Sequence, residues 1–145
     1  MIRVLLADDQ PLVRVGLAAI LRAQPDVDVV GQVADGREAL ELVRRLRPDV
    51  VLIDIRMPRL DGLQATRLIV ADHDLDQVKV IILTTFGLDE YVVEALQIGA
   101  SGFLIKHCEP ADLTRPVRVT AAADPAIEPN WWSSPTKADR YRPTG

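Results

Sequence analysis

The chain has 145 residues, of which 48% are hydrophobic and 26% charged, so it is long enough for one domain with a sizeable core. Its 17 basic and 21 acidic residues are interspersed and give a formal net charge of -4, which argues against a chain that binds nucleic acid as a whole. The single cysteine excludes an internal disulfide, and without a signal peptide or an apolar run of ~18 residues we expect a cytoplasmic protein that does not enter a membrane.

Strand-like and helix-like segments alternate along residues 1–120. The expected strands are Ile2–Ala7, Val27–Val33 and residues 50–53, 80–83 and 102–105, and the expected helices are residues 12–22, 37–47, 62–71, 89–98 and a fifth that opens at Glu109-Pro110. Residues 50–53 are apolar on both faces, as in a central parallel strand, whereas Val27–Val33 alternates apolar and polar residues, as in an edge strand. Five strand–helix units predict an α/β fold, a doubly wound parallel sheet with helices on both faces.

The character of the sequence changes after about Thr120. Residues 121–145 contain four prolines and both tryptophans, and they show no periodicity. We expect residues 1–120 to form the domain and residues 121–145 to be an irregular or disordered Pro-rich tail. Trp131 and Trp132 could dock on the domain or on a partner, but nothing around them is amphipathic, which favours an adventitious tail.

Four of the apolar runs end in side chains that can do chemistry. Asp8 and Asp9 follow the first run, Asp54 the third, Thr84 the fourth and Lys106 the fifth. In doubly wound sheets ligands bind at the carboxyl ends of the strands, near the point where strand order reverses. We therefore expect carboxylates, a hydroxyl and an ammonium group to meet at one edge of the sheet.

This set of groups suits a divalent cation and a phosphoryl group. The carboxylates are the hard oxygen ligands that Mg²⁺ prefers, and a metal would relieve their mutual repulsion. Asp54, alone at the end of the most buried strand, can act as a nucleophile on phosphorus and form an aspartyl-phosphate. Phosphoryl transfer needs positioning and charge neutralisation, which Mg²⁺, Lys106 and the Thr84 hydroxyl can supply.

Taken one at a time, these residues have ordinary structural explanations. An aspartate after a strand is often a helix cap, a threonine at a strand end often bonds the backbone, and a single lysine is usually a solvated charge. Their combination at four strand ends is what favours a functional site.

Two other classes of phosphate-binding protein fit the sequence less well. A phosphatase that forms an aspartyl-phosphate places Asp-x-Asp after the first strand, whereas here the two aspartates are adjacent and Arg56 stands two residues beyond Asp54. A flavodoxin-like cofactor binder needs a Ser/Thr/Gly-rich phosphate loop where this chain has Asp8-Asp9-Gln10-Pro11, which repels phosphate unless a metal intervenes.

Five segments together resemble the receiver domain of two-component response regulators. They are Ala7-Asp8-Asp9, Ile53-Asp54-Ile55-Arg56-Met57-Pro58, Asp61-Gly62, Leu83-Thr84-Thr85-Phe86 and the run from Gly99 to Lys106. The resemblance covers residues 1 to about 120, and the Leu-Thr-Thr-Phe segment is most similar to the NarL/FixJ-like subgroup with a LuxR-type helix-turn-helix output. It implies a flavodoxin-like, CheY-like sheet with strand order 2-1-3-4-5.

The resemblance also implies how the metal and the phosphoryl group are held. Asp54 would be the phosphoacceptor. Mg²⁺ would be bound by Asp8, Asp9 and Asp54, with the backbone carbonyl of Arg56 completing the protein ligands. The phosphoryl donor would be a sensor histidine kinase, and the chain would catalyse only its own Mg²⁺-dependent phosphorylation and dephosphorylation, so it would not be an enzyme in the usual sense.

The same resemblance also implies roles for three residues in the response to phosphorylation. Thr84 would be the switch hydroxyl and Lys106 the phosphate partner. Phe103 falls where the family has its switch aromatic, and a core aromatic on a central strand explains it equally well. Phosphorylation would shift the population between two conformations.

The sequence departs from the family at several points. Pro116 lies well inside the fifth helix and predicts that this helix kinks, begins late or ends early, which puts the family's homodimer mode in question. His107 and Cys108 follow Lys106, and such a pair is more often part of an ordinary loop than a metal or redox site. His73 lies in an acidic segment and is expected to be a solvated loop residue.

The 25 residues after Thr120 are too few for a helix-turn-helix domain. The first hypothesis is therefore a receiver that controls transcription, and reaches DNA, through an output domain absent from this chain. The alternative is a stand-alone receiver that acts through protein contacts without DNA.

Overall fold

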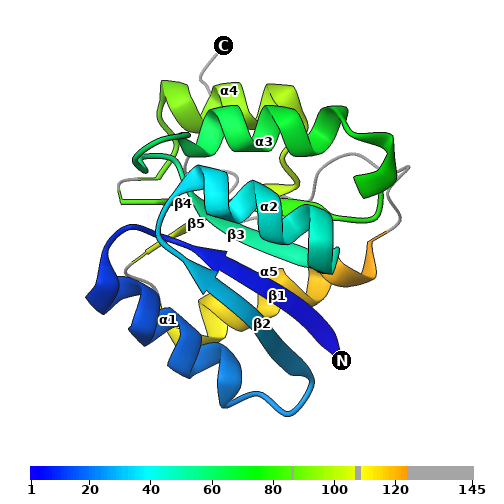
Figure 1. Ribbon diagram of the computed structural model, residues 1–145. Helices are drawn as coiled ribbons and strands as arrows, with labels where there is room; N and C mark the ends of the chain where they lie inside the picture. The colour runs from blue at the N-terminus through cyan, green and yellow to red at the C-terminus, as the bar shows by residue number, and fades with distance from the viewer. Residues whose placement is uncertain (86, 107–108, 124–145) are drawn as a thin grey trace.

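The computed structural model describes residues 1–85, 87–106 and 109–123 (Figure 1). Its five strands are β1 (Ile2–Ala7), β2 (Val27–Val33), β3 (Val50–Asp54), β4 (Lys79–Thr84) and β5 (Gly102–Ile105). Its helices are α1 (Pro11–Arg22), α2 (Gly36–Leu46), α3 (Gly62–Ala71), α4 (Glu90–Ile98) and α5 (Pro110–Ala122), with a short 3-10 helix η1 (His73–Leu75). The predicted alternation of strands and helices is confirmed.

The strands form one parallel sheet in the order β2-β1-β3-β4-β5, so the predicted fold class and strand order are confirmed. Every residue of β3 is buried between β1 and β4, because neighbours on both sides and helices on both faces exclude water. β2 lies at the edge, as its alternating sequence predicted.

Helices cover both faces of the sheet, with α2, α3 and α4 on one face and α1 and α5 on the other (Figure 1). Alternate strand residues supply two cores, since successive side chains point to opposite faces. Leu5 and Ile53 pack into the core under α2, α3 and α4, whereas Leu6 and Leu52 pack into the core under α1 and α5. The sheet is therefore held rigidly from both sides, which fixes the positions of its strand ends.

Strand order reverses between β1 and β3, because β1 pairs with β2 on one side and with β3 on the other. Ala7 is opposite Ile53, so Asp8 follows β1 next to Asp54 at the end of β3. The residues with reactive groups therefore gather at the position where doubly wound sheets usually bind ligands.

The prediction that Pro116 makes the fifth helix begin late or end early was wrong. α5 runs without interruption from Pro110 to Ala122 with Pro116 inside it. Leu113 and Val117, on either side of the proline, are fully buried in the core under α1 and α5. Packing of this apolar stripe compensates for the hydrogen bond that proline cannot donate.

Several predictions fall on residues that the structure does not describe. They concern His107, Cys108, Trp131, Trp132 and, apart from residues 121–123 at the end of α5, the predicted tail. Among the described residues, no helix is long and apolar enough to cross a bilayer.

Candidate functional site

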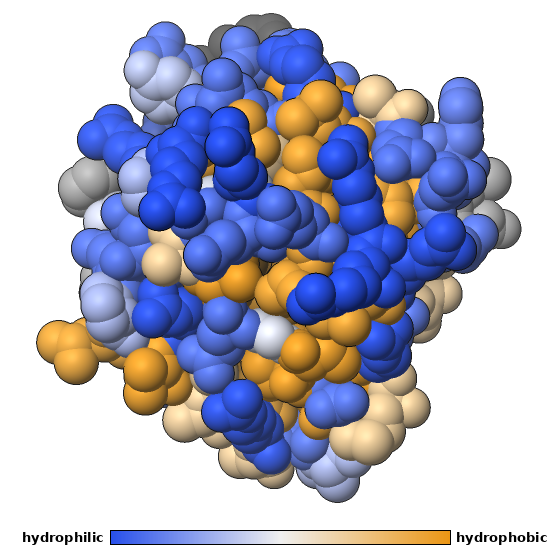
Figure 2. Space-filling view, viewed as in Figure 1, coloured by the Kyte–Doolittle hydropathy of each residue, from blue (hydrophilic) through white to orange (hydrophobic). Residues whose placement is uncertain are grey.

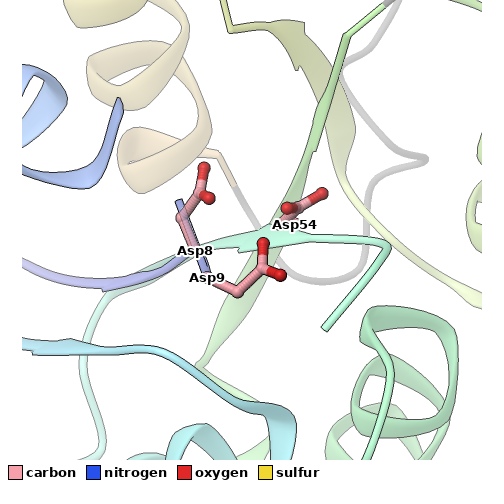
Figure 3. Close-up of side chains that lie close together, drawn as sticks. All are labelled: Asp8, Asp9 and Asp54. Atoms are coloured by element: carbon pink, nitrogen blue, oxygen red, sulfur yellow. The ribbon is translucent and has the colours of Figure 1, made fainter. Parts of the chain in front are cut away.

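Three aspartate side chains meet at the carboxyl ends of β1 and β3 (Figure 3). Asp8 and Asp9 are consecutive residues directly after β1, and Asp54 is the last residue of β3. One carboxylate oxygen from each lies within 4.8 Å of the others, close enough to share one metal ion. Asp8 and Asp54 are buried whereas Asp9 is exposed, so the cluster opens to solvent on one side.

Asp8 has a buried oxygen that no hydrogen bond satisfies. Its Oδ1 accepts hydrogen bonds from the Gln10 backbone N–H at 2.8 Å and from Lys106 at 3.3 Å. Its Oδ2 has no hydrogen-bond partner within the described part of the chain, although Lys106 Nζ lies 3.1 Å away. This carboxylate oxygen accepts no hydrogen bond and can take a further ligand, for which a divalent cation is suitable.

The Lys106 ammonium group reaches the cluster from the residue after β5. Its Nζ donates hydrogen bonds to Asp54 Oδ2 at 2.8 Å, to Gln10 Oε1 at 2.6 Å and to Asp8 Oδ1 at 3.3 Å. Lys106 is buried, and its position follows from the register, which pairs Thr84 with Ile105 and so carries β5 to the same edge.

Burial and charge act in opposite directions on these groups. Burial raises the pKa of the Asp54 carboxyl above 3.8, with a further rise from Asp8, and together these outweigh the lowering by Lys106. Burial alone would lower the pKa of Lys106, but its hydrogen bonds and ion pairs with Asp54 and Asp8 raise it. The site therefore holds more negative charge than one ammonium group neutralises, and it would bind additional positive charge favourably.

Gly62 brings the end of the loop after β3 back against the end of this strand. The Gly62 N–H donates to the Ile55 carbonyl at 2.7 Å, and a Cβ at Gly62 would lie 2.2 Å from the Asp54 carbonyl oxygen. Only glycine permits this close approach of two backbone segments. In the same loop the Arg56 N–H donates to Asp54 Oδ1 at 3.3 Å, so the second oxygen of Asp54 is also oriented.

The Thr84 hydroxyl is buried at the end of β4 and turned toward the next loop. It donates to the Gly87 carbonyl at 3.3 Å. Thr84 and Asp54 both line a small pocket of about 90 Å³. Phe103 is half-buried on β5 and packs against the core under α2, α3 and α4.

A second, wider pocket of about 540 Å³ borders the carboxylates on the solvent side. Its lining includes Asp9 and Arg56, apolar side chains of the loop after β3, and Tyr91 from the first turn of α4. This pocket reaches from solvent to the exposed member of the aspartate cluster.

All of the expected site residues, namely Asp8, Asp9, Asp54, Arg56, Thr84, Phe103 and Lys106, lie on or directly after strand ends at this edge or on β5. Sequence reasoning missed Gln10, whose side chain bonds Lys106, and Tyr91, which lines both pockets. Gln10 directly follows Asp9, and Tyr91 lies two residues after Asp89, but these positions in the sequence do not reveal side-chain direction. His73 lies in η1 after α3 and is exposed.

A family model described as the response regulator receiver domain matches residues 4–118. LiaR of Bacillus subtilis, a transcriptional regulatory protein, is 41% identical over 128 residues, which are 88% of this chain and 60% of LiaR. The response regulator VraR of Staphylococcus aureus is 38% identical over 128 residues, again 88% of this chain and 60% of VraR. The chain thus spans about 60% of the length of these relatives.

Solved structures show the same similarity. The signal receiver domain of a response regulator described as NarL, from Mycobacterium tuberculosis, has a TM-score of 0.79 and 36% identity over 85% of this chain and 98% of that one. The receiver domain of the sensor histidine kinase PA1611 from Pseudomonas aeruginosa has a TM-score of 0.75 and 34% identity over 83% of this chain and 98% of that one. That second structure has a magnesium ion coordinated in its active site cleft.

Proposed function

The chain belongs to the response regulator receiver family, and from that premise we propose that it accepts a phosphoryl group on Asp54 from a sensor histidine kinase. Three observations support Asp54. Asp54 is the last residue of the fully buried strand β3. Lys106 Nζ donates a hydrogen bond to its Oδ2 at 2.8 Å. Asp54 also belongs to the carboxylate cluster and lines the small pocket that Thr84 borders. Asp8 is fully buried and lines neither pocket, whereas Asp9 is exposed and lines only the wider one.

Mg²⁺ is the cation that fits the carboxylate cluster best. The donors are three carboxylates, with the Arg56 carbonyl as a proposed fourth ligand, and hard oxygen ligands favour Mg²⁺ over softer metals. The approach of one oxygen from each of the three carboxylates to within 4.8 Å of the others is the single observation that most supports a metal here. When bound, the ion would offset the negative charge of the carboxylates and of the incoming phosphoryl oxygens.

In the proposed reaction an Asp54 oxygen bonds to phosphorus while the bond from phosphorus to the donor breaks. Lys106 is close enough to Asp54 to exchange one of its present acceptors for a phosphoryl oxygen. The Thr84 hydroxyl would leave Gly87 and donate to another phosphoryl oxygen, which would pull the β4–α4 loop toward the site. Phe103 on β5 would respond to that movement as the switch aromatic.

The surface beside the site supports a protein donor. Leu12 and Val15 at the start of α1 are 90% and 60% exposed. Hydrophobic groups protrude at the lower left of Figure 2, where Figure 1 places the beginning of this helix. A kinase domain packing on these side chains would bring its phosphohistidine near the aspartate cluster, in the cytoplasm.

The relatives' names support transcriptional control as the output. LiaR is named a transcriptional regulatory protein, and this chain matches 60% of it. We propose that residues 1–120, with the end of α5 up to Ala122, are the phosphoacceptor domain, and that DNA is reached only through a further domain. We propose that homodimerisation after phosphorylation links the phosphoacceptor domain to DNA binding by the further domain.

Intact mass after incubation with Mg²⁺ and acetyl phosphate tests the proposal. The parent chain should gain about 80 Da, the mass of one phosphoryl group, and Asp54→Asn should gain nothing. Asp28→Asn, an exposed carboxylate near the start of β2, is the matched control and should react like the parent. Chelation of Mg²⁺ should abolish the gain. A persistent gain in Asp54→Asn would move the acceptor elsewhere.

A further inference from the structure

Asp8 and Asp9 lie in the short turn between β1 and α1. The Asp8 N–H donates to the Val33 carbonyl at 3.0 Å, which continues the pairing of β1 with β2. Asp8 Oδ1 accepts a hydrogen bond from the Gln10 N–H at 2.8 Å. A further bond comes from α1, where Arg14 Nη1 donates to the Asp8 backbone carbonyl at 2.6 Å. This last bond holds the peptide group that joins the two aspartates.

The Asp9 carboxylate takes its position from the backbone alone. Asp9 is exposed, and among the described residues its side chain has no hydrogen bond or ion pair. Because a peptide group is planar, the direction of the Asp8 carbonyl sets the direction in which the chain enters the Asp9 Cα. The bond from Arg14 to that carbonyl therefore restricts where the Asp9 carboxylate can lie.

We propose that Arg14 is a positioning residue, which holds the peptide between Asp8 and Asp9 so that the Asp9 carboxylate can share a divalent cation with the other two carboxylates of the cluster. The inference rests on the proposed magnesium site. Arg14 is not itself a ligand of the ion, because a guanidinium group offers only hydrogen-bond donors and carries a positive charge. It acts on the metal through Asp9, as an outer partner that orients a ligand.

The stability of α1 does not explain the contact that Arg14 makes. Arg14 precedes the buried residues Leu17 and Ala18 by three and four positions, so it lies on the buried face of the helix, at the end nearest the aspartates. The helix dipole disfavours a cation near the N-terminus, and the first turn of α1 has no acidic residue to offset it. The half-buried side chain instead reaches back along the chain to the Asp8 carbonyl.

Mg²⁺ binding to the full chain, measured by isothermal titration calorimetry without a phosphoryl donor, tests the proposal. Arg14→Met removes the hydrogen-bond donor and should raise the dissociation constant about tenfold, as loss of an outer-shell partner typically does. If Arg14 acted only through its charge, the same variant would bind Mg²⁺ more tightly, because a nearby positive charge repels the ion. The two explanations therefore predict opposite signs.

Two further variants and a stability measurement complete the test. Arg22→Met removes the same charge from the last turn of α1, where the side chain is exposed, and should bind Mg²⁺ like the parent. Arg14→Lys keeps both a charge and a donor, so it should lose less affinity than Arg14→Met. Thermal unfolding in a chelator should show Arg14→Met folded at room temperature, with a melting temperature about 5 °C below that of the parent, because one hydrogen bond is lost.

Four outcomes would overturn the role of Arg14. Unchanged or tighter binding by Arg14→Met means that the Asp9 carboxylate is placed without it. Equal weakening by Arg14→Met and Arg22→Met means that the bond to the Asp8 carbonyl is not what matters. An Arg14→Met chain that is unfolded at room temperature in the chelator means that this residue supports the fold rather than the metal site. A larger loss in Arg14→Lys than in Arg14→Met means that the donor does not restore binding.

The parent chain separates failure of this role from failure of the proposed function. If the parent binds Mg²⁺ and is phosphorylated at Asp54 while Arg14→Met binds Mg²⁺ equally well, only the role of Arg14 is wrong. If the parent does not bind Mg²⁺, the proposed magnesium site is wrong, and the role of Arg14 is wrong with it.

Discussion

Two ion pairs of the same length lie in opposite surroundings. Arg118 Nε and Asp26 Oδ2 are 2.8 Å apart, and so are Lys106 Nζ and Asp54 Oδ2. The first pair ties α5 to the turn before β2 with side chains 39% and 45% exposed, whereas the second is buried at the carboxyl edge of the sheet, with side chains 3% and 9% exposed. The difference lies in access to water and in the charges nearby.

The two carboxyl groups respond in opposite directions. The hydrogen bond from Arg118 holds the pKa of Asp26 below 3.8, whereas burial raises the pKa of Asp54 above 3.8 despite Lys106. An exposed ion pair contributes little to the free energy of unfolding. A buried pair with a second carboxylate beside it leaves unneutralised charge, which a cation and a phosphoryl group can use.

The largest expected effect comes from removing the buried cation. Lys106→Met leaves Asp8 and Asp54 buried without their shared partner, which should lower the free energy of unfolding by about 3 kcal/mol. Thermal unfolding in a chelator should show a melting temperature roughly 10 °C below that of the parent. An unchanged melting temperature would mean that the buried pair contributes no more than an exposed one.

Mg²⁺ should have the next largest effect on the free energy of unfolding, and this effect should depend on the carboxylates beside the buried pair. At a free concentration ten times its dissociation constant, Mg²⁺ should stabilise the folded chain by about 1.4 kcal/mol, because the unfolded chain has no site. Asp9→Asn should reduce this gain, whereas Asp28→Asn, near the start of β2, should not. Equal gains in both variants would place the metal away from the cluster.

The pH dependence of stability should have opposite signs at the two carboxylates. The raised pKa of Asp54 means that its charge destabilises the fold above pH 3.8, so Asp54→Asn should melt above the parent at pH 7 in a chelator, and the difference should shrink as pH falls toward 3.8. The lowered pKa of Asp26 means that its charge stabilises the fold above pH 3.8, and this contribution is lost as pH falls through that lowered pKa.

Asp26→Asn should therefore melt below the parent at pH 7 and approach it in acid. Melting curves of both variants from pH 3 to pH 7 measure the two signs directly. Shifts of the same sign at pH 7 would contradict the contrast between the two sites.

The smallest effect is expected at the exposed pair. Arg118→Met removes the ion pair with Asp26 and a hydrogen bond to Gln24, all at the surface, so the melting temperature should fall only slightly. In about 1 M salt, where charges are screened beyond roughly 3 Å, the difference from the parent should narrow further. A large fall that is insensitive to salt would show that this pair behaves like the buried one.

The sheet and the convergence of Asp8, Asp54, Thr84 and Lys106 could be predicted because both follow from a simple rule. Apolar runs alternating with helices predict parallel strands, and parallel strands bring their carboxyl ends to one edge. Residues placed directly after a strand inherit their position from the backbone. No knowledge of side-chain packing is needed for that step.

The remaining features depend on tertiary contacts that a linear pattern does not contain. Gln10 could not be assigned, because its side chain bonds a lysine 96 residues away. The contact of the Thr84 hydroxyl with Gly87 depends on the path of the β4–α4 loop. Local propensity predicted a shortened or bent helix at Pro116, but burial of Leu113 and Val117 keeps α5 continuous.

We expect the buried carboxylate at the end of β3, and no other aspartate, to carry the phosphoryl group. Borohydride reduces an aspartyl-phosphate to homoserine but leaves free aspartate unchanged, so peptide mass spectrometry after phosphorylation and reduction identifies the modified position. Homoserine is expected at position 54 alone, and only when Mg²⁺ is present. Homoserine at position 8 or 9, or none at position 54, would contradict it.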